Sequence, residues 1–332
     1  MNKEIWVVCD HVPDGKADII FGMLTKAFDL AKKADCHTTA VCFGKHSSEY
    51  MQELFYYGTE NVLHIEHDNV STEIQSKILC QVISQRKPVL IMFPASEYGR
   101  RMASYVSVEF EAGLTAECIE IEFGENKNFE YKRAAINSSA IATIQCINSD
   151  VELCTVKENI FIPKRLNEPL DGKIEKNIYD ETFSDIFSDA ITVLEKEEKI
   201  TEKLDINSSK IVFGAGRGIK DAETVELLFS VANKIGASVV GTRAIVEENL
   251  IERFRQVGQS GISIRPEIYI CFGVSGASQH IVGIKNAKII VAVNTDENAP
   301  IFDYADYIIH DDAVKVLKEI EEYFNKKGEI RC

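Results

Sequence analysis

Residues Ile268 to Asn294 constrain the fold more than any other stretch, because an apolar run at each end flanks a turn and a short helical pattern. Each run has the length and composition of a buried strand. The turn, Gly273–Ser278, carries little side-chain bulk, so its backbone N–H groups can approach an anion at the start of the helix. Two polar side chains follow it, Gln279 and His280. We therefore expect a flat, nucleotide-type cofactor whose reactive ring lies beside His280.

The composition describes an ordinary globular chain and excludes several classes of function. A length of 332 residues suits two domains. The net charge of -15 argues against a nucleic-acid binder, which needs a basic face. No apolar run approaches the roughly 20 residues of a membrane span, and the N-terminus does not resemble a signal peptide. The nine cysteines form no Cys-x-x-Cys pair, so we expect no metal site and a cytoplasmic location.

The first half of the chain alternates apolar runs with helical patterns. The predicted strands are Ile5–Cys9, Thr38–Phe43, Val62–Ile65 and Val89–Phe93, and the predicted helices are 17–34, 48–56, 72–84 and 99–110. This alternation predicts an α/β domain with a mostly parallel sheet covered by helices on both faces. After residue 110, apolar runs at 118–123, 131–136, 141–146 and 153–156 predict consecutive strands that add antiparallel strands to that sheet.

A second α/β domain begins sharply at Lys210. Its predicted strands are 210–213, 238–240, 268–272, 289–293 and 307–309, with helices at 221–235, after Ala277 and at 313–324. This order predicts a doubly wound parallel sheet whose ligand loops follow the strands. We therefore divide the chain into an N-terminal domain (1–165), a charged interdomain connection (166–209) and a C-terminal domain (210–332) that holds the ligand.

Two loops of the C-terminal domain bear on the identity of that ligand. Gly214–Gly218 lacks the last glycine of the dinucleotide fingerprint and is either a tight turn or, through Arg217, a phosphate clamp. Thr242 and Arg243 stand where an NAD-binding fold places an acidic residue for the ribose. The absence of that acid argues against NAD.

Four further segments complete the predicted site. Gln256–Gly261 and the turn before His280 combine glycines with hydrogen-bonding side chains, and Asn294 ends a strand. Asp312 is either a helix N-cap or an acceptor for a ribose hydroxyl. Because the C-terminal ends of parallel strands lie on one edge, we expect all of these segments to meet there. They contain no catalytic triad, carboxylate pair or metal-ligand spacing, which favours a redox cofactor over hydrolysis.

The segments G-R-G-I-K, T-R-A, Q-V-G-Q-S-G, Y-I-C-F-G-V-S-G-A-S-Q-H-I-V-G, V-A-V-N-T-D and A-P-I-F-D-Y-A-D-Y resemble the α subunit of electron transfer flavoproteins, in order and spacing. The first domain resembles that family more loosely, through Ala140–Ile144. The resemblance implies FAD on the C-terminal domain and a heterodimer with an electron transfer flavoprotein β subunit. It also implies one-electron transfer between flavoenzymes of the acyl-CoA dehydrogenase type and an acceptor, with flavin-based bifurcation as an open question.

Carried over by motif, the resemblance implies cofactor contacts from Arg217, Thr242, Arg243, Val257, Gly258, Gln259, Ser260, Ser275, Gly276, Ala277, Ser278, Gln279, His280, Asn294 and Asp312. It implies Arg217 on the phosphate or adenosine side, and Arg243, Ser260 and His280 around the flavin ring as tuning groups. None of them is expected to act as an acid–base catalyst. Asn294 is expected near the pyrophosphate and Asp312 near the adenosine. Ser278 stands where the family usually has an aliphatic residue.

Two other functions remain open at this point. One is an NAD- or nucleotide-dependent oxidoreductase, which the isolated chain would reveal by direct hydride exchange. The other is a binding module that has lost the flavin and senses an adenine nucleotide. An electron carrier is favoured over a stand-alone enzyme, because the loops offer donors for negative charge and no acid–base machinery.

Overall fold

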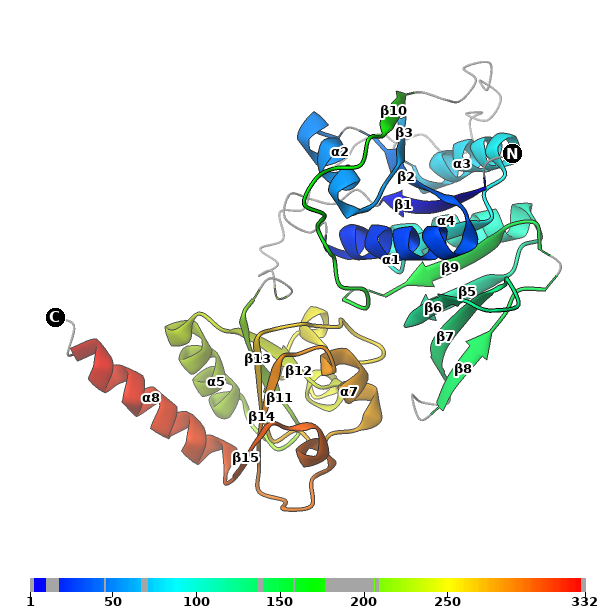
Figure 1. Ribbon diagram of the computed structural model, residues 1–332. Coiled ribbons are helices and arrows are strands. Elements are labelled where there is room, and N and C mark those ends of the chain that lie inside the picture. The colour runs from blue at the N-terminus through cyan, green and yellow to red at the C-terminus, as the bar shows by residue number, and fades with distance from the viewer. Residues whose placement is uncertain are drawn as a thin grey trace. The chain divides into compact units, whose positions relative to one another are not determined.

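The computed structural model describes residues 3–9, 18–44, 46–66, 71–135, 140–147, 149–157, 159–176, 206 and 209–329 (Figure 1). The chain forms two compact units, one with all strands before residue 177 and the other with all strands from residue 211. Most of the predicted connection at 166–209, including its charged run, lies outside the described residues. The limits of the predicted domains therefore stay predictions.

The first unit is built on a seven-stranded sheet in the order β10-β3-β2-β1-β4-β9-β5, with every pair parallel. Its strands are β1 (Glu4–Cys9), β2 (His37–Phe43), β3 (Asn61–Ile65), β4 (Leu90–Pro94), β5 (Leu114–Cys118), β9 (Glu152–Val156) and β10 (Lys173–Lys176). Its helices are α1 (Asp18–Ala34), α2 (Ser48–Leu54), α3 (Thr72–Arg86) and α4 (Glu97–Glu109), with a 3-10 turn at Phe55–Tyr57.

Strand β1 explains how this sheet is covered on both faces. Its six residues are all buried. Ile5 and Val7 belong to the apolar cluster that includes α1, whereas Trp6 and Val8 belong to the cluster that includes α3 and α4. Alternate residues of a strand point to opposite faces, so each face of the sheet packs against its own helices. The predicted parallel α/β fold is confirmed.

The antiparallel strands are present, but they form a sheet of their own. β6 (Glu120–Phe123), β7 (Phe129–Ala135) and β8 (Ala140–Ile144) pair in the order β6-β7-β8. The predicted strand at 153–156 instead joins the main sheet as the parallel strand β9. The burial patterns explain the difference, because β9 is almost wholly buried whereas β8 alternates half-buried and exposed residues. A strand buried on both faces is typical of a covered parallel sheet, whereas a strand buried on one face is typical of an antiparallel sheet.

The second unit is a five-stranded parallel sheet in the order β12-β11-β13-β14-β15. Its strands are β11 (Ile211–Ala215), β12 (Ser238–Gly241), β13 (Ile268–Phe272), β14 (Ile289–Asn294) and β15 (Tyr307–His310). Its helices are α5 (Ala222–Ile235), α6 (Arg243–Glu247), α7 (Ser278–Ile284) and α8 (Ala313–Glu329), with 3-10 turns at Arg253–Arg255 and Pro300–Tyr304. The doubly wound prediction is confirmed, although α6 is not among the helices predicted from the sequence.

Helices cover both faces of this sheet, and alternate strand residues pack against the helices of opposite faces. α5 and α8 share one apolar cluster with Phe213 and Phe272, and α7 shares the other with Val212 and Tyr269 (Figure 1). The chain runs from β11 to β12 in one direction and then returns past β11 to β13. The strand order therefore reverses between β11 and β13, which is where open α/β sheets bind their ligands. Among the described residues, no helix combines the length and the apolar character that crossing a membrane demands.

The loops after β11 and β13 meet backbone to backbone at this reversal. The N–H of Gly216 donates to the Phe272 carbonyl at 2.9 Å, and the N–H of Gly218 donates to the Gly273 carbonyl at 3.0 Å. A Cβ atom on Gly216 would lie 2.2 Å from the Gly273 oxygen. Gly216 does not need a left-handed backbone, so it is glycine here because of the close approach alone.

Replacing Gly216 by alanine should therefore separate the two loops and destabilise the second unit. We expect Gly216→Ala to cost about 3 kcal/mol in free energy of unfolding, the upper part of the usual range for overpacking. The control is Gly236→Ala, where φ is +71° and no atom lies within 4 Å, so only backbone strain of about 1 kcal/mol applies. Urea unfolding of the full chain measures both. An equal or smaller loss for Gly216→Ala would contradict the close-packed loops.

Candidate functional site

The predicted site residues lie along the C-terminal edge of the second sheet, as expected. Arg217 follows β11, Arg243 begins α6 just beyond β12, and the turn before His280 follows β13. Asn294 ends β14, and Asp312 follows β15. Neighbouring strands lie about 4.8 Å apart, so the five strand ends extend over roughly 19 Å. An edge of this length fits an elongated ligand, with β12 at one end and β15 at the other.

Most side chains on this edge are accessible and are hydrogen-bond donors. Exposed residues are Arg217, Arg243, Ser260, Ser275, Ala277, Ser278, Gln279 and Asp312, and partly exposed residues are Thr242, Gln259 and Asn294. The buried members are Val257, Gly258, Gly276 and His280. Guanidinium, amide and hydroxyl groups donate to phosphate and carbonyl oxygens. The donor set therefore fits a dinucleotide with a flat, carbonyl-bearing ring.

The loop at 256–262 is held against α7 by its glycines. The N–H of Val257 donates to the Gly241 carbonyl at 2.9 Å, and the N–H of Gln259 donates to the Gln279 carbonyl at 2.7 Å. Gly258 has φ +138°, and a Cβ there would lie 2.6 Å from the Gln279 oxygen. Because no side chain fits between loop and helix, the exposed Ser260 is carried on a segment fixed by backbone contacts.

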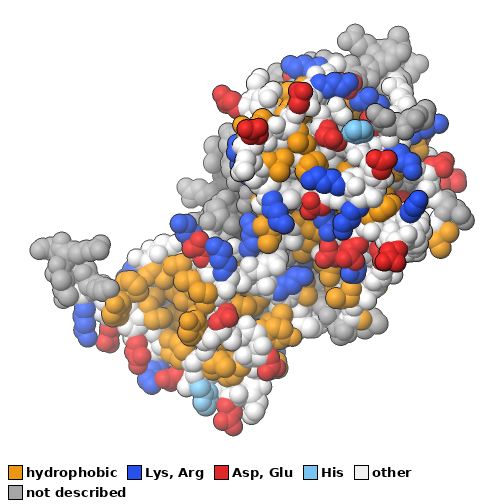
Figure 2. Space-filling model, in the orientation of Figure 1, with side chains coloured by type: hydrophobic (Ala, Val, Ile, Leu, Met, Phe, Trp, Pro, Cys, Tyr) orange, Lys and Arg blue, Asp and Glu red, His pale blue; other side chains and the backbone are white. Residues whose placement is uncertain are grey.

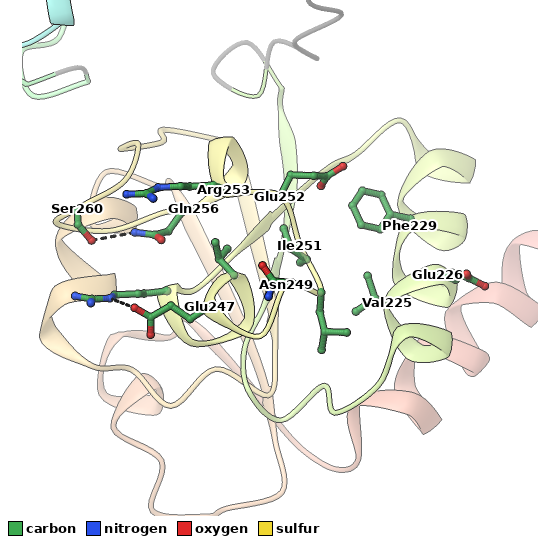
Figure 3. Close-up of a pocket in the computed structure, with 13 residues that line it drawn as sticks. Val225, Glu226, Phe229, Glu247, Asn249, Ile251, Glu252, Arg253, Gln256 and Ser260 are labelled. Atoms are coloured by element: carbon green, nitrogen blue, oxygen red, sulfur yellow. Dashed lines mark hydrogen bonds and ion pairs between the residues drawn. The ribbon is translucent and has the colours of Figure 1, made fainter.

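A groove of about 920 Å³ lies at the β12 end of the edge (Figure 3). Its apolar wall includes Val225, Phe229 and Ile251. Of the predicted residues, Arg243 and Ser260 line it, and those that follow β13, β14 and β15 do not. The groove therefore marks the end of the edge where the resemblance implies the flavin ring.

Four polar groups of the groove are paired with one another. Arg243 donates through Nε to Glu247 Oε1 at 2.7 Å, one helical turn away. Figure 3 shows Gln256 directed toward Ser260, and its Nε2 donates to the serine Oγ at 2.9 Å. Glu247 is not among the site residues predicted from the sequence. Its spacing of four from Arg243 is the signal for a helical ion pair, but only once this segment is assigned as helix.

His280 is the most enclosed polar residue of the site, with 5% of its surface exposed. Its Nδ1 lies 3.2 Å from the Val257 carbonyl, and its Nε2 lies 2.8 Å from the Tyr269 hydroxyl. Burial lowers its pKa to about 4, although the hydrogen bond to Val257 opposes that shift. The imidazole is therefore neutral near pH 7. Donation from His280 to a ligand stays a prediction, and it requires the ring to give up one of these two contacts.

Two other residues that are predicted to contact the ligand are hydrogen-bonded within the chain. The Asn294 side-chain amide donates to the Val274 carbonyl at 2.9 Å, which ties β14 to the turn after β13. Asp312 Oδ1 accepts from the N–H groups of Val314 and Lys315 at 2.9 and 3.2 Å. Asp312 thus caps α8, the first of the two roles considered from sequence. Their expected ligand contacts stay predictions, as does the role of Ser278.

Sheet order distinguishes the two roles considered for Arg217. Its strand, β11, lies beside β12 and three positions away from β15. If Arg243 lies at the flavin end and Asp312 at the adenosine end, Arg217 is too close to the flavin end for the adenosine. The phosphate side is therefore the role that the strand order favours. Among the described residues, no three His, Cys, Asp or Glu side chains are grouped to hold a metal ion.

Family models match both parts of the chain. Residues 205–285 match the model described as "Electron transfer flavoprotein FAD-binding domain", and residues 5–181 match the "Electron transfer flavoprotein domain". FAD is the cofactor of the matched C-terminal domain. The exposed guanidinium, amide and hydroxyl donors on the edge fit its phosphate and carbonyl oxygens.

Curated relatives match nearly the whole chain. The electron transfer flavoprotein subunit alpha of Clostridium acetobutylicum is 30% identical over 96% of this chain and 96% of its own length. Protein FixB of Clostridium saccharobutylicum is 31% identical, over 96% and 95%. The lactate dehydrogenase (NAD(+),ferredoxin) subunit LctC of Acetobacterium woodii is 30% identical, over 96% of this chain and 76% of its own. The chain therefore belongs to the electron transfer flavoprotein family, within its α-subunit branch.

Proposed function

We propose that this chain is the FAD-carrying subunit of a heterodimeric electron carrier. It pairs with a β subunit and relays electrons one at a time between flavoenzymes of the acyl-CoA dehydrogenase type and an acceptor. The observation that carries the proposal is the donor-rich edge where the strand order reverses. Bound FAD supplies the redox chemistry. The chain's donors, Arg243 above all, stabilise the negative charge that reduction adds at this edge.

Exposed apolar surface on the second unit supports a partner subunit. Hydrophobic side chains gather on this unit in the view of Figure 2. Strand β15 is exposed along its whole length, with Tyr307 at 62% and Ile308 at 55%. Exposed apolar side chains on an edge strand invite association with another chain. The β subunit is the occupant that we propose for this surface.

We also place the complex in the cytoplasm, and the described cysteines support this, because all of them are free thiols. Flavin-based electron bifurcation is a more specific form of the same function. It is favoured by LctC, whose name joins NAD(+) and ferredoxin in one dehydrogenase. One FAD per heterodimer would argue for simple transfer, and two would argue for bifurcation.

Co-expression of the chain with its β subunit tests the function directly. We expect a yellow complex that keeps FAD through gel filtration and is reduced by an acyl-CoA dehydrogenase together with its substrate. The isolated chain should not exchange hydride with NADH. A colourless complex that takes up no FAD would refute the proposal. Direct hydride exchange by the isolated chain would instead favour a nucleotide-dependent oxidoreductase.

Substitutions of Arg243 and of Glu247 should shift the FAD reduction potential of the complex in opposite directions. Arg243→Gln removes a cation that stabilises the reduced cofactor, and Glu247→Gln removes the carboxylate that offsets this cation. The pair is exposed, so a stabilisation of about 1 kcal/mol is the upper limit, or roughly 20 mV in a two-electron potential. We expect the potential to fall in Arg243→Gln and to rise in Glu247→Gln, as measured by dye-coupled titration.

Arg253→Gln is the matched control for that experiment. Arg253 also lines the groove and carries the same charge, but it does not follow a strand end. Its removal should leave the potential within a few millivolts of the original. Equal shifts from Arg243→Gln and Arg253→Gln would mean that only the overall charge of the groove matters.

Acidification should destabilise the chain through His280. The pKa of His280 is about 4 in the folded chain against an ordinary value of 6.5. As pH falls below 6.5, the unfolded chain binds a proton that the folded chain excludes, so stability falls until pH 4. At pH 5 this costs about 2 kcal/mol. In urea unfolding, the free energy of unfolding should differ less between pH 7 and pH 5 in His280→Gln than in the unmodified chain, by this amount. An unchanged difference would contradict a neutral, buried imidazole.

A further inference from the structure

Arg255 is a buried arginine in a segment whose other side chains reach the surface. Its side chain is 7% exposed, whereas the three residues before it, Glu252, Arg253 and Phe254, are exposed. It is not among the site residues predicted from the sequence, and it does not line the groove. Burying a charge costs free energy unless the charge is paired and hydrogen-bonded. The partners of this guanidinium therefore indicate what its burial achieves.

Strand β12 lies at one end of the five-stranded sheet, so within the described residues one of its sides faces no strand. Successive residues of a parallel strand bond to neighbours on opposite sides. The N–H of Thr242 donates to the Ala215 carbonyl of β11. Gly241 and Val239 alternate with Thr242 and therefore present their carbonyls on the free side. Val239 is only 2% exposed, and a buried carbonyl without a donor costs free energy.

The loop at 256–262 occupies this free side, at first as a neighbouring strand would. The N–H of Val257 donates to the Gly241 carbonyl at 2.9 Å, in a parallel register. Continued by two residues, that register would give the Val239 carbonyl to the N–H of Arg255. The chain forms a 3-10 turn there instead, and the N–H of Arg255 donates within the turn at 2.9 Å. The turn therefore removes the backbone donor that Val239 needs.

The Arg255 side chain supplies the missing donor. Its Nη1 donates to the Val239 carbonyl at 3.0 Å, and its Nε lies 3.0 Å from Glu252 Oε2 in an ion pair. The guanidinium carbon lies 5.1 Å from the ring centroid of Phe229 and 5.0 Å from that of Phe254. Arginine suits these partners, because its planar fork can donate in several directions while it lies close to aromatic rings. A lysine ammonium lacks the planar fork.

This contact connects the sheet edge with the site. Phe229 belongs to the apolar wall of the groove (Figure 3). Gln256 directly follows Arg255 and donates through Nε2 to Ser260 Oγ at 2.9 Å. On its other side, backbone hydrogen bonds hold the same loop against α7. The loop that carries Ser260 is therefore fixed between the edge of β12 and α7, and Arg255 provides a side-chain contact on the β12 side.

We propose that Arg255 is a positioning residue of the cofactor site, whose guanidinium replaces a missing backbone donor on the free side of β12 and so holds the loop at 256–262 in place. Its importance for FAD rests on the proposed function, whereas the anchoring of the loop does not. Without this anchor, only a fraction of the molecules present Ser260 in the binding arrangement. The apparent affinity for the cofactor then falls by that fraction.

The first test is amide hydrogen exchange in the full chain, with and without the β subunit. In the unmodified chain we expect the N–H of Val257, which donates to Gly241, to exchange as slowly as the amides of β12. Rapid exchange at Val257 would overturn the proposal. This measurement does not depend on whether any variant folds or whether FAD binds.

Arg255→Met and Arg255→Lys then separate the fork from the charge. Both variants lose the fork, and only the lysine keeps the charge. Each should speed exchange in the loop at 256–262 roughly tenfold, the usual effect of one buried hydrogen bond, while β13 and β14 stay protected. Each should also weaken FAD binding by the complex roughly tenfold. Lys288→Met removes an exposed cation that pairs with Glu267 at 3.5 Å, and it should change neither measurement.

The outcomes distinguish the parts of the proposal. Unchanged loop exchange in Arg255→Met would overturn the anchor, and unchanged loop exchange in Arg255→Lys would overturn the role of the fork. Faster exchange in β13 as well as in the loop would mean that Arg255 supports the whole unit. Faster loop exchange with unchanged FAD affinity would overturn the positioning role. If the unmodified complex binds no FAD while Val257 is protected, the proposed function fails and the anchor stands.

Discussion

The second unit depends on the contact between backbones at the point where its strand order reverses. Gly216 and Gly218 lie against Gly273 without any side chain between them. Strands β11 and β13 therefore stay paired to their last residues, Ala215 and Phe272, and their loops leave the sheet side by side. An open α/β sheet offers its ligand crevice at such a reversal. The shape of the edge is thus set by glycines, before any functional side chain is considered.

Close packing at glycines also occurs beneath this edge. Gly258 and Gly283 bring a loop and α7 into backbone contact, and Gly214 makes room for a tyrosine ring. Beneath the edge, the polar groups Tyr269 and His280 are neutral and satisfy each other, which avoids the cost of burying a charge. The permanent charges of Arg217 and Arg243 stay at the solvent side. The site therefore has buried neutral groups beneath the edge and exposed ions on it.

The sequence predicts the parts of this arrangement that depend only on strand direction. Apolar runs that alternate with helical patterns locate most of the parallel strands, and strand direction alone brings Arg217, Arg243 and Asp312 to one edge. The separate sheet of β6, β7 and β8 is not predictable in this way, because an alternating strand does not reveal which sheet it joins. The contact of Tyr269 with His280 is hidden for another reason. A tyrosine in an apolar run is typical of a packing residue. The space for its hydroxyl depends on Gly214, which lies in a different strand.

The division between buried and exposed groups has a consequence for how such a site can be tuned. Arg243 is 70% exposed and is paired with Glu247 at 2.7 Å, so its charge is partly offset by a residue that does not follow any strand end. Changing that partner alters the field at the β12 end of the edge without moving a strand or a loop. A change beneath the edge acts on a buried hydrogen bond instead, since Tyr269 and His280 are each other's partners at 2.8 Å. The exposed ion pairs and the buried hydrogen bonds of the site can therefore be altered by separate substitutions, and the two kinds of interaction differ in their dependence on solvent.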